Sequence, residues 1–214
     1  WYQVLRRKTI RQFGEEEADL AVRQLIPILQ QQVLADSFTT KIYGLIGHAC
    51  LNSDAYVQGA WYYEQCLAGL IKHNCKIGVG TAYMSLGYAL KMQGDYQEAK
   101  QYYLTAIPLL EKEQNFKNLS EACINLGDLS RYTGAFEQSR NYYHRAAEAY
   151  PPKSADLEGL LGWSYSDEDR DAEALHYFKI AENKNGLDAE LARGLSVSCE
   201  AVNDTVQANF YYKQ

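Results

Sequence analysis

A motif that recurs after 40 residues constrains the fold of this chain more than any other feature. In the first copy, Leu86 and Gly87 lie in a helical pattern that breaks at Gly94, and a second helical pattern follows. Leu126 and Gly127 occupy the same places in the second copy. An internal period of this length is typical of a solenoid, in which each unit packs only on its neighbours. We therefore predict an all-α fold built from repeated helix–turn–helix hairpins.

Six hairpins account for the 214 residues, and we expect them to form a single solenoid domain. The predicted units are, in chain order, 1–33, 38–74, 77–114, 117–150, 154–184 and 187–214, and the first of them is degenerate. After Pro151 and Pro152 the spacing shortens, because Leu161 follows Leu126 by 35 residues and Leu195 follows by another 34. Long repeats are therefore expected before this proline pair and shorter repeats after it.

Small residues recur where the two helices of a hairpin would cross, and large residues recur beside them. A glycine or alanine at a crossing lets two backbones approach, and a leucine, tyrosine or phenylalanine then fills the adjoining space. In the second helices of the third, fifth and sixth hairpins the small and aromatic residues are Ala99 and Tyr103, Ala174 and Phe178, and Ala208 and Tyr212. We expect these aromatic rings to pack between helices.

This pattern resembles the tetratricopeptide repeat, whose first helix carries W/L-x-x-L-G-x-x-Y and whose second carries A-x-x-x-F and A-x-x-x-x-P. The positions that carry the resemblance are Tyr83, Leu86, Gly87, Leu90, Ala99, Tyr103 and Ala106, then Cys123, Leu126, Gly127, Phe136, Tyr143 and Ala146, then Leu161, Gly162, Tyr165, Ala174, Phe178 and Ala181. The resemblance covers most of the chain from Lys41 onward, although Cys50 and Ser130 replace the tyrosine and Gly59 and Ser139 replace the alanine. It implies a right-handed superhelical solenoid of antiparallel hairpins. The 40-residue spacing is similar to the long-repeat branch of that family.

Two local features predict where helices begin and bend. Asp95 is predicted to cap the second helix of the third hairpin, and Glu98 three residues later completes a capping-box pattern. Pro27 and Pro108 lie inside predicted helices. We expect each proline to kink its helix, because proline lacks the backbone N–H and clashes with the preceding turn.

The charge of the chain argues against nucleic acid as a direct partner. The formal net charge is −6, the pI is near 5.3, and the lysines and arginines are scattered rather than gathered in a stripe. The longest apolar stretches are far shorter than the ~20 residues that cross a bilayer, so no membrane-spanning segment is expected. The cysteines are Cys50, Cys66, Cys75, Cys123 and Cys199. Four of them fall at small-residue positions of a repeat, which indicates buried, reduced thiols and a cytoplasmic location.

The two ends of the sequence predict that the natural chain is longer. The sequence begins at Trp1 rather than at a methionine. The second helix of the last hairpin is short, and no polar capping helix follows it. Because an uncapped solenoid end exposes apolar surface, we expect the chain to continue or this end to be covered by a partner.

No arrangement of residues suited to catalysis is visible. The serines and cysteines lack a glycine-rich nucleophile elbow, and no phosphate-binding loop occurs, because the glycines fall at helix crossings or turns. Cys66, His73 and Cys75 come nearest to a metal cluster, but a structural zinc ion needs four ligands in paired spacing. We therefore expect a protein that is not an enzyme and binds no metal or cofactor.

The resemblance also implies where a partner would bind, because the first helices of such hairpins line a concave groove. The groove positions carried over to this chain are Lys41, Gly44, Leu45, His48, Leu51 and Asn52; Thr81, Met84, Ser85, Tyr88, Lys91 and Met92; Glu121, Ile124, Asn125, Asp128, Arg131 and Tyr132; and Asp156, Gly159, Leu160, Trp163, Ser166 and Asp167. We expect the binding residues to be His48, Met84, Tyr88, Asn125, Asp128, Arg131, Tyr132 and Trp163. This mixture suits an extended or helical peptide, and the amide of Asn125 could hold main-chain donors and acceptors. A single groove position is still more often a packing or solvated residue than a binding one.

The sequence therefore predicts a non-catalytic protein–protein interaction scaffold that binds a peptide or partner protein. One branch of the family holds the acidic tail of heat-shock chaperones with lysines and asparagines, but here only Asn125 is retained, which argues against that role. One alternative is a peptide-sensing regulatory domain of a larger protein. Another is self-assembly, as a homo-oligomer, through exposed array ends or through a convex row of tyrosines that includes Tyr62, Tyr102 and Tyr142.

Overall fold

The computed structural model describes residues 24–25, 36–151 and 154–213. Within these residues all regular secondary structure is helical, which confirms the predicted all-α class. The first predicted hairpin, 1–33, and Pro27 with it fall outside the described residues apart from residues 24 and 25. The chain separates into two compact units, residues 1–114 and 115–214, and each is described by itself.

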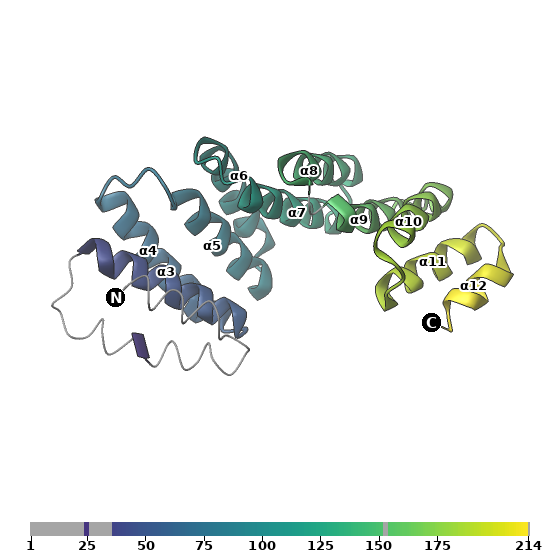
Figure 1. Ribbon diagram of the computed structural model, residues 1–214, viewed down its shortest axis with the longest axis horizontal. Coiled ribbons are helices and arrows are strands. Elements are labelled where there is room, and N and C mark those ends of the chain that lie inside the picture. The colour runs from purple at the N-terminus through teal and green to yellow at the C-terminus, as the bar shows by residue number, and fades with distance from the viewer. Residues whose placement is uncertain (1–23, 26–35, 152–153, 214) are drawn as a thin grey trace. The chain divides into compact units, whose positions relative to one another are not determined.

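The described part of the first unit consists of two helical hairpins (Figure 1). Its helices are α3 (Asp36–Asn52), α4 (Tyr56–Lys72), α5 (Val79–Gln93) and α6 (Tyr96–Lys112), and each packs against the next. Beyond the end of α6, the Glu113 carboxylate accepts hydrogen bonds from the backbone N–H groups of Gly78 (3.0 Å) and Gly80 (2.9 Å) at the start of α5. This glutamate satisfies backbone donors that a helix start leaves without partners, and it ties the two helices together.

The second unit consists of three hairpins. Its helices are α7 (Phe116–Tyr132), α8 (Phe136–Ala149), α9 (Ser154–Ser166), α10 (Asp171–Asn185), α11 (Ala189–Ala201) and α12 (Thr205–Tyr211), and again each contacts its successor. Arg140 on α8 reaches the next hairpin, where its guanidinium lies 2.7 Å from the Glu168 carboxylate and 4.4 Å from the centre of the Tyr165 ring. Tyr165 in turn stacks on Tyr177, with ring centres 5.2 Å apart. These contacts connect the hairpins on either side of the proline pair.

The turn inside each described hairpin places one residue in the left-handed region of the backbone. These residues are Asp54, Gly94, Gly134, Asp169 and Asn203, with φ between 56° and 91°. In every case the N–H of the next residue donates to a carbonyl five residues earlier, at 2.8 to 3.0 Å. This bond pattern belongs to a helix C-cap, so the same motif ends the first helix of all five hairpins.

The predicted close approach of paired helices is confirmed in four hairpins. The glycine and the aromatic ring that it faces are Gly47 and Tyr63, Gly87 and Tyr103, Gly127 and Tyr143, and Gly162 and Phe178. A β-carbon at Gly127 would lie 2.4 Å from Cε1 of Tyr143, closer than real contacts allow. Only a residue without a side chain therefore fits beneath this ring without displacing it.

The sixth hairpin departs from this rule, and one prediction for it is wrong. Tyr212, the predicted packing aromatic, is 84% exposed, whereas Tyr211 is buried and donates a 3.0 Å hydrogen bond to Glu182. Ser196 stands where the other hairpins have their glycine, and its hydroxyl donates to the carbonyl of Ala208 at 3.1 Å. The serine side chain occupies the surface on which a ring packs elsewhere, so the neighbouring Tyr211 is the ring that is buried.

The local predictions for α6 are corrected in part. Asp95 is the N-cap residue, but its side chain accepts no capping hydrogen bond, so the predicted capping box is wrong. The turn is already held by the backbone bond from Asp95 N–H to the carbonyl of Leu90, and the aspartate side chain is exposed to water. The helix also continues through the exposed Pro108 as far as Lys112, and the kink expected at this proline stays a prediction. Side-chain caps occur instead at the residues that precede α7, α11 and α12, which are Asn115, Asp188 and Asp204.

The burial predicted for four of the five cysteines is confirmed. Cys50, Cys66, Cys123 and Cys199 are buried, whereas Cys75 is half-buried. Burial raises the pKa of the Cys66 thiol to about 11, so this group stays protonated near neutral pH. The four buried thiols therefore pack as small apolar side chains.

Candidate functional site

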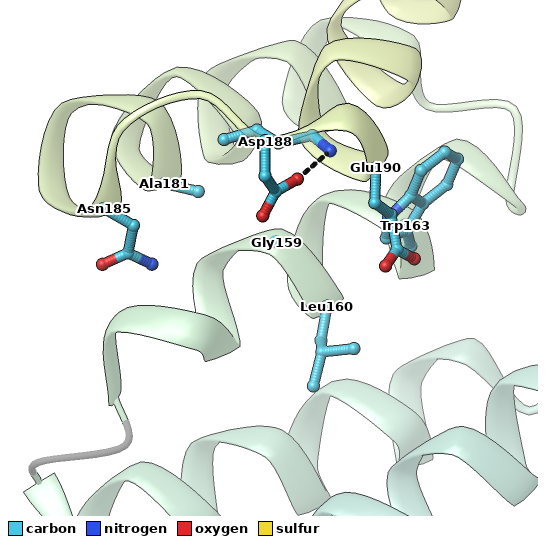
Figure 2. Close-up of a pocket in the computed structure, with 8 residues that line it drawn as sticks. Gly159, Leu160, Trp163, Ala181, Asn185, Asp188 and Glu190 are labelled. Carbon is cyan, nitrogen blue, oxygen red and sulfur yellow. Dashed lines mark hydrogen bonds between the residues drawn. The ribbon is translucent and has the colours of Figure 1, made fainter.

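A pocket of about 280 Å³ lies in the second unit between α9, α10 and the start of α11 (Figure 2). The residues that line it are Gly159, Leu160, Trp163, Ala181, Asn185, Asp188, Glu190 and Leu191. Gly159, Leu160 and Trp163 are groove positions inferred from the sequence, and the structure brings these three together. The pocket is therefore where the predicted groove and a measurable concave surface coincide.

Trp163 is fixed by contacts on both the core side and the solvent side. Its half-buried indole meets the fully buried Phe178 edge-on, with ring centres 5.1 Å apart. The guanidinium of Arg193, an exposed residue on α11, lies 4.8 Å from the centre of the Trp163 ring. An edge-on aromatic contact and a cation over the ring both favour one orientation of the indole. The pocket thus has a pre-positioned aromatic wall.

The wall of the pocket on the α11 side is acidic. One carboxylate oxygen of Asp188 accepts a 2.8 Å hydrogen bond from the Leu191 N–H and so caps α11, as the dashed line in Figure 2 shows. Glu190 follows in the first turn of the same helix and has no cationic partner among the described residues. Lys184, near the end of α10, is paired with Glu158 at 2.5 Å instead. The lining therefore contains two carboxylates and no basic side chain.

Two predicted binding residues on α7 are engaged in contacts within the second unit. The Arg131 guanidinium lies 2.6 Å from the Asp167 carboxylate, at the turn between α9 and α10, and 4.8 Å from the centre of the Tyr132 ring. Asp128 accepts a 2.9 Å hydrogen bond from the Tyr143 hydroxyl on α8. Tyr132 itself is 64% exposed. Of these residues, only Tyr132 presents most of its side chain to solvent.

Asn125 is less accessible than the sequence analysis expected. Its side chain is buried, and its Nδ2 donates a 2.9 Å hydrogen bond to the backbone carbonyl of Glu121, one turn earlier in α7. An asparagine amide carries two donor hydrogens and one acceptor oxygen. Part of this capacity is used inside the helix, which leaves less for a partner.

The remaining predicted residues belong to the first unit. His48 on α3 is exposed, and its Nε2 lies 3.5 Å from Nδ2 of Asn52. Tyr88 on α5 is half-buried and meets Tyr56 edge-on, with ring centres 6.2 Å apart, and Met84 is half-buried one turn earlier. None of these three residues lines the pocket around Trp163. His48, Met84 and Tyr88 remain predicted groove residues.

Five residues of the pocket were missed by the sequence analysis. They are Ala181, Asn185, Asp188, Glu190 and Leu191. Groove positions were carried over only as far as the fifth hairpin, whereas these residues lie at the end of α10 and the start of α11. The pattern of an aspartate followed three residues later by a leucine marks Asp188 as a helix start, but no local pattern marks it as facing Trp163.

Comparison with known proteins assigns the repeat. Residues 80–109 and 120–153 match the family model of the tetratricopeptide repeat. These two segments are tetratricopeptide repeats. One of them lies in each unit, and they carry the glycine–tyrosine pairs Gly87–Tyr103 and Gly127–Tyr143. No curated protein matches the chain in sequence.

Solved structures share the fold of this chain at low sequence identity. BtubC (BKLC) from P. vanneervenii matches with a TM-score of 0.72 and 14% identity over 92% of this chain and 86% of that one. MamA from Desulfovibrio magneticus RS-1 matches with a TM-score of 0.66 and 17% identity over 82% of this chain and 92% of that one. The apo form of RapI matches with a TM-score of 0.74 and 11% identity over 91% of this chain but 57% of that one. At such identities the likeness concerns the fold alone.

The tetratricopeptide repeats give this chain the architecture of a protein-interaction scaffold, and they imply protein partners. Within the described residues, no group of three or more histidine, cysteine, aspartate and glutamate side chains is placed to hold a metal ion. None of the described helices is both long enough and apolar enough to cross a membrane.

Proposed function

We propose that this chain is a non-catalytic scaffold that binds a peptide segment of a partner protein along the first helices of its repeats, with the pocket around Trp163 as an anchoring point. The observation that carries the proposal is the meeting of three sequence-predicted groove residues, Gly159, Leu160 and Trp163, in one concave site. A volume of 280 Å³ is at the low end for ligand sites, so it suits one side chain of a bound segment rather than a whole small molecule.

The rigidity of the site supports this mode of binding. Trp163 is held against the buried Phe178, and α9 contacts both α10 and α11. A pre-organised surface loses little conformational freedom on binding, so most of the ordering cost falls on the peptide. Tryptophan is also one of the side chains that are enriched among the residues contributing most binding energy at interfaces.

The exposed Tyr132 extends the proposed binding surface within the second unit. Its ring packs under the Arg131 guanidinium, which Asp167 holds from the opposite hairpin. Arg131 and Asp167 thus position Tyr132, whereas Asp128 mainly supports Tyr143. The partner-facing surface of α7 is therefore narrower than the sequence analysis suggested.

The test is a selection of peptides from a random library displayed on phage, with the intact chain as bait. Affinities of the selected peptides are then measured by fluorescence anisotropy for the wild type, for Trp163→Ala and for Trp61→Ala. Trp61 is a matched control because it is a half-exposed tryptophan on α4, a second helix of its hairpin. We expect Trp163→Ala to weaken binding by about 30-fold or more and Trp61→Ala to leave it unchanged.

Two results would contradict the proposal. Circular dichroism checks that Trp163→Ala remains folded. Selected peptides that bind folded Trp163→Ala and the wild type with the same affinity would move the binding site away from this pocket. A selection that yields no peptide above background would contradict peptide binding itself.

A second candidate function is self-association, which the apolar surface of α12 and of its C-cap residue Tyr212 favours. Val206, Phe210 and Tyr212 are 80%, 56% and 84% exposed. Sedimentation equilibrium of the wild type and of Phe210→Glu tests this candidate. A mass that rises with concentration in the wild type and not in the variant would support association through α12, and a constant monomer mass in both would remove it.

A further inference from the structure

We infer that the pocket beside Trp163 is selective for a basic side chain of the bound segment, and in particular for the guanidinium group of an arginine. This inference deepens the proposed function and rests on it, because both use the same pocket.

The charge of the lining is negative and largely uncompensated. Asp188 uses one oxygen to cap α11, which leaves its second oxygen outside that bond. Figure 2 shows the Asp188 carboxylate drawn between Asn185 on one side and Trp163 on the other. Glu190 has no cationic partner among the described residues, and the nearby Lys184 is occupied by Glu158. A cation that entered would therefore meet carboxylates without having to displace an internal ion pair.

The indole of Trp163 already makes a cation–π contact with the guanidinium of Arg193. Arg193 lies 4.8 Å from the ring centre, which is within the ~6 Å range of a favourable cation–π contact. The planar guanidinium stacks on aromatic faces better than the compact ammonium of lysine. Arg193 is exposed and does not line the pocket, so it shows which chemistry the ring accepts without filling the cavity.

A purely structural explanation is that Asp188 and Glu190 serve only to start α11. Acidic residues in a first turn do favour a helix, by a modest amount. That role requires one capping oxygen, which Asp188 supplies, and it does not require Glu190 to line a cavity with a tryptophan. The combination of an aromatic wall, carboxylates and a volume fit for one side chain is what a basic side chain needs.

The test uses two short capped peptides that differ in one group. The first is acetyl-Ala-Ala-Arg-Ala-Ala-amide, and in the second citrulline replaces arginine, which keeps the shape and removes the charge. Binding to the intact chain is followed by the indole N–H resonance of Trp163 in ¹H–¹⁵N spectra. That resonance is assigned by its loss in Trp163→Phe, since the chain has three tryptophans.

We expect a saturable shift with the arginine peptide and binding at least about five-fold weaker with the citrulline peptide. The double variant Asp188→Asn and Glu190→Gln removes both charges while asparagine keeps the helix cap. It should bind arginine with a smaller preference than the wild type does, because only the cation–π contact with Trp163 is left. The control double variant Glu148→Gln and Glu200→Gln makes the same change in net charge at exposed positions outside the pocket, and it should retain the preference for arginine.

Equal binding of the two peptides by the wild type would overturn the inference, and so would the absence of a saturable shift with either. A preference for arginine that is undiminished in the double variant Asp188→Asn and Glu190→Gln would overturn it as well. These failures are distinct from failure of the proposed function. If library-selected peptides depend on Trp163 while arginine and citrulline bind alike, the proposed function stands and only the selectivity fails.

Discussion

The hydroxyl of Tyr143 on α8 donates a 2.9 Å hydrogen bond to the carboxylate of Asp128 on α7. The Tyr143 ring is fully buried above Gly127, whereas Asp128 is half-buried at a predicted groove position. Burial first, and then the neighbouring carboxylate, raise the pKa of Tyr143 above its ordinary range. One side chain thus closes the hairpin and also fixes a residue that the sequence assigns to the groove.

Loss of this hydrogen bond should weaken the fold measurably. Tyr143→Phe keeps the ring and removes the hydroxyl, so we expect a loss of about 1 kcal/mol in the free energy of unfolding. Asp128→Ala should cost about 1–3 kcal/mol, because it leaves a buried hydroxyl without its acceptor. Urea unfolding followed by circular dichroism measures both. Tyr142→Phe is the control, since this adjacent ring is only half-buried, and it should change the midpoint little. An unchanged midpoint for Asp128→Ala would mean that the hydroxyl has another acceptor.

The raised pKa of Tyr143 also predicts how stability depends on pH. A tyrosine in the unfolded chain ionises near pH 10, whereas Tyr143 in the fold keeps its proton to higher pH. At a pH between 10 and the raised pKa of Tyr143, the unfolded chain binds fewer protons than the folded chain. The contribution to stability is therefore complete below about pH 10 and is lost as the pH rises above it.

We expect the wild type to lose more stability between about pH 9 and pH 11 than Tyr143→Phe does. Tyr211, whose pKa burial and Glu182 raise to about 12, should cause part of the loss that remains in the variant. Urea midpoints at the two pH values provide the comparison. Equal losses in the two proteins would show that Tyr143 does not contribute to the alkaline transition.

Two glycines in helices should respond to the same substitution with opposite signs. A β-carbon at Gly127 would lie within 2.4 Å of the Tyr143 ring, so Gly127→Ala should destabilise the chain by about 1–3 kcal/mol through overpacking. A β-carbon at Gly159 meets nothing within 4 Å, so Gly159→Ala should stabilise α9 by about 0.5–1 kcal/mol through helix propensity. Thermal unfolding of both variants checks the signs. A neutral Gly127→Ala would mean that the ring moves aside at little cost.

Substituting either of two serines on α11 by alanine should change the stability of the chain, with opposite signs for the two positions. The Ser198 hydroxyl is buried and has no hydrogen-bond partner among the described residues, so Ser198→Ala should stabilise the chain by about 0.5–1 kcal/mol. The Ser196 hydroxyl connects α11 to α12 through the Ala208 carbonyl, so Ser196→Ala should destabilise by about 1 kcal/mol despite the better helix propensity of alanine. Urea midpoints decide between the signs. Destabilisation by Ser198→Ala would indicate that a buried water satisfies its hydroxyl.

Arg193 should compete with a basic ligand at Trp163. Arg193→Gln removes a like charge and uncovers part of the indole, so both effects favour an incoming guanidinium. We expect the arginine peptide to bind this variant about two- to five-fold more tightly, with less gain as salt is added. The Trp163 indole N–H resonance gives the affinity. Lys179→Gln on α10, which removes a positive charge from a residue that does not line the pocket, should show no such gain.

The amino-acid sequence by itself determined the class of fold and the main packing contacts within each hairpin. The recurrence of Leu126 and Gly127 after 40 residues predicts helix pairs that pack on their neighbours, and the structure shows them. The glycine beneath an aromatic ring and the buried cysteines followed from the same pattern. These features are readable because they depend on helix periodicity and on contacts within a hairpin, which link residues close together in the chain.

The tertiary structure alone decided which side chains meet between hairpins. Asp188 and Glu190 join Trp163 in one pocket, and Arg193 lies over the indole, because of how α9, α10 and α11 are rotated against one another. The same applies to Tyr211, which is buried in place of Tyr212 because Ser196 fills the surface of the missing glycine. Packing between helices decides which of two neighbouring rings is buried and which rotamer Arg193 adopts. No local sequence pattern encodes this packing. The repeat pattern thus determines the helical fold, whereas the side chains that line the pocket are brought together by packing between successive hairpins.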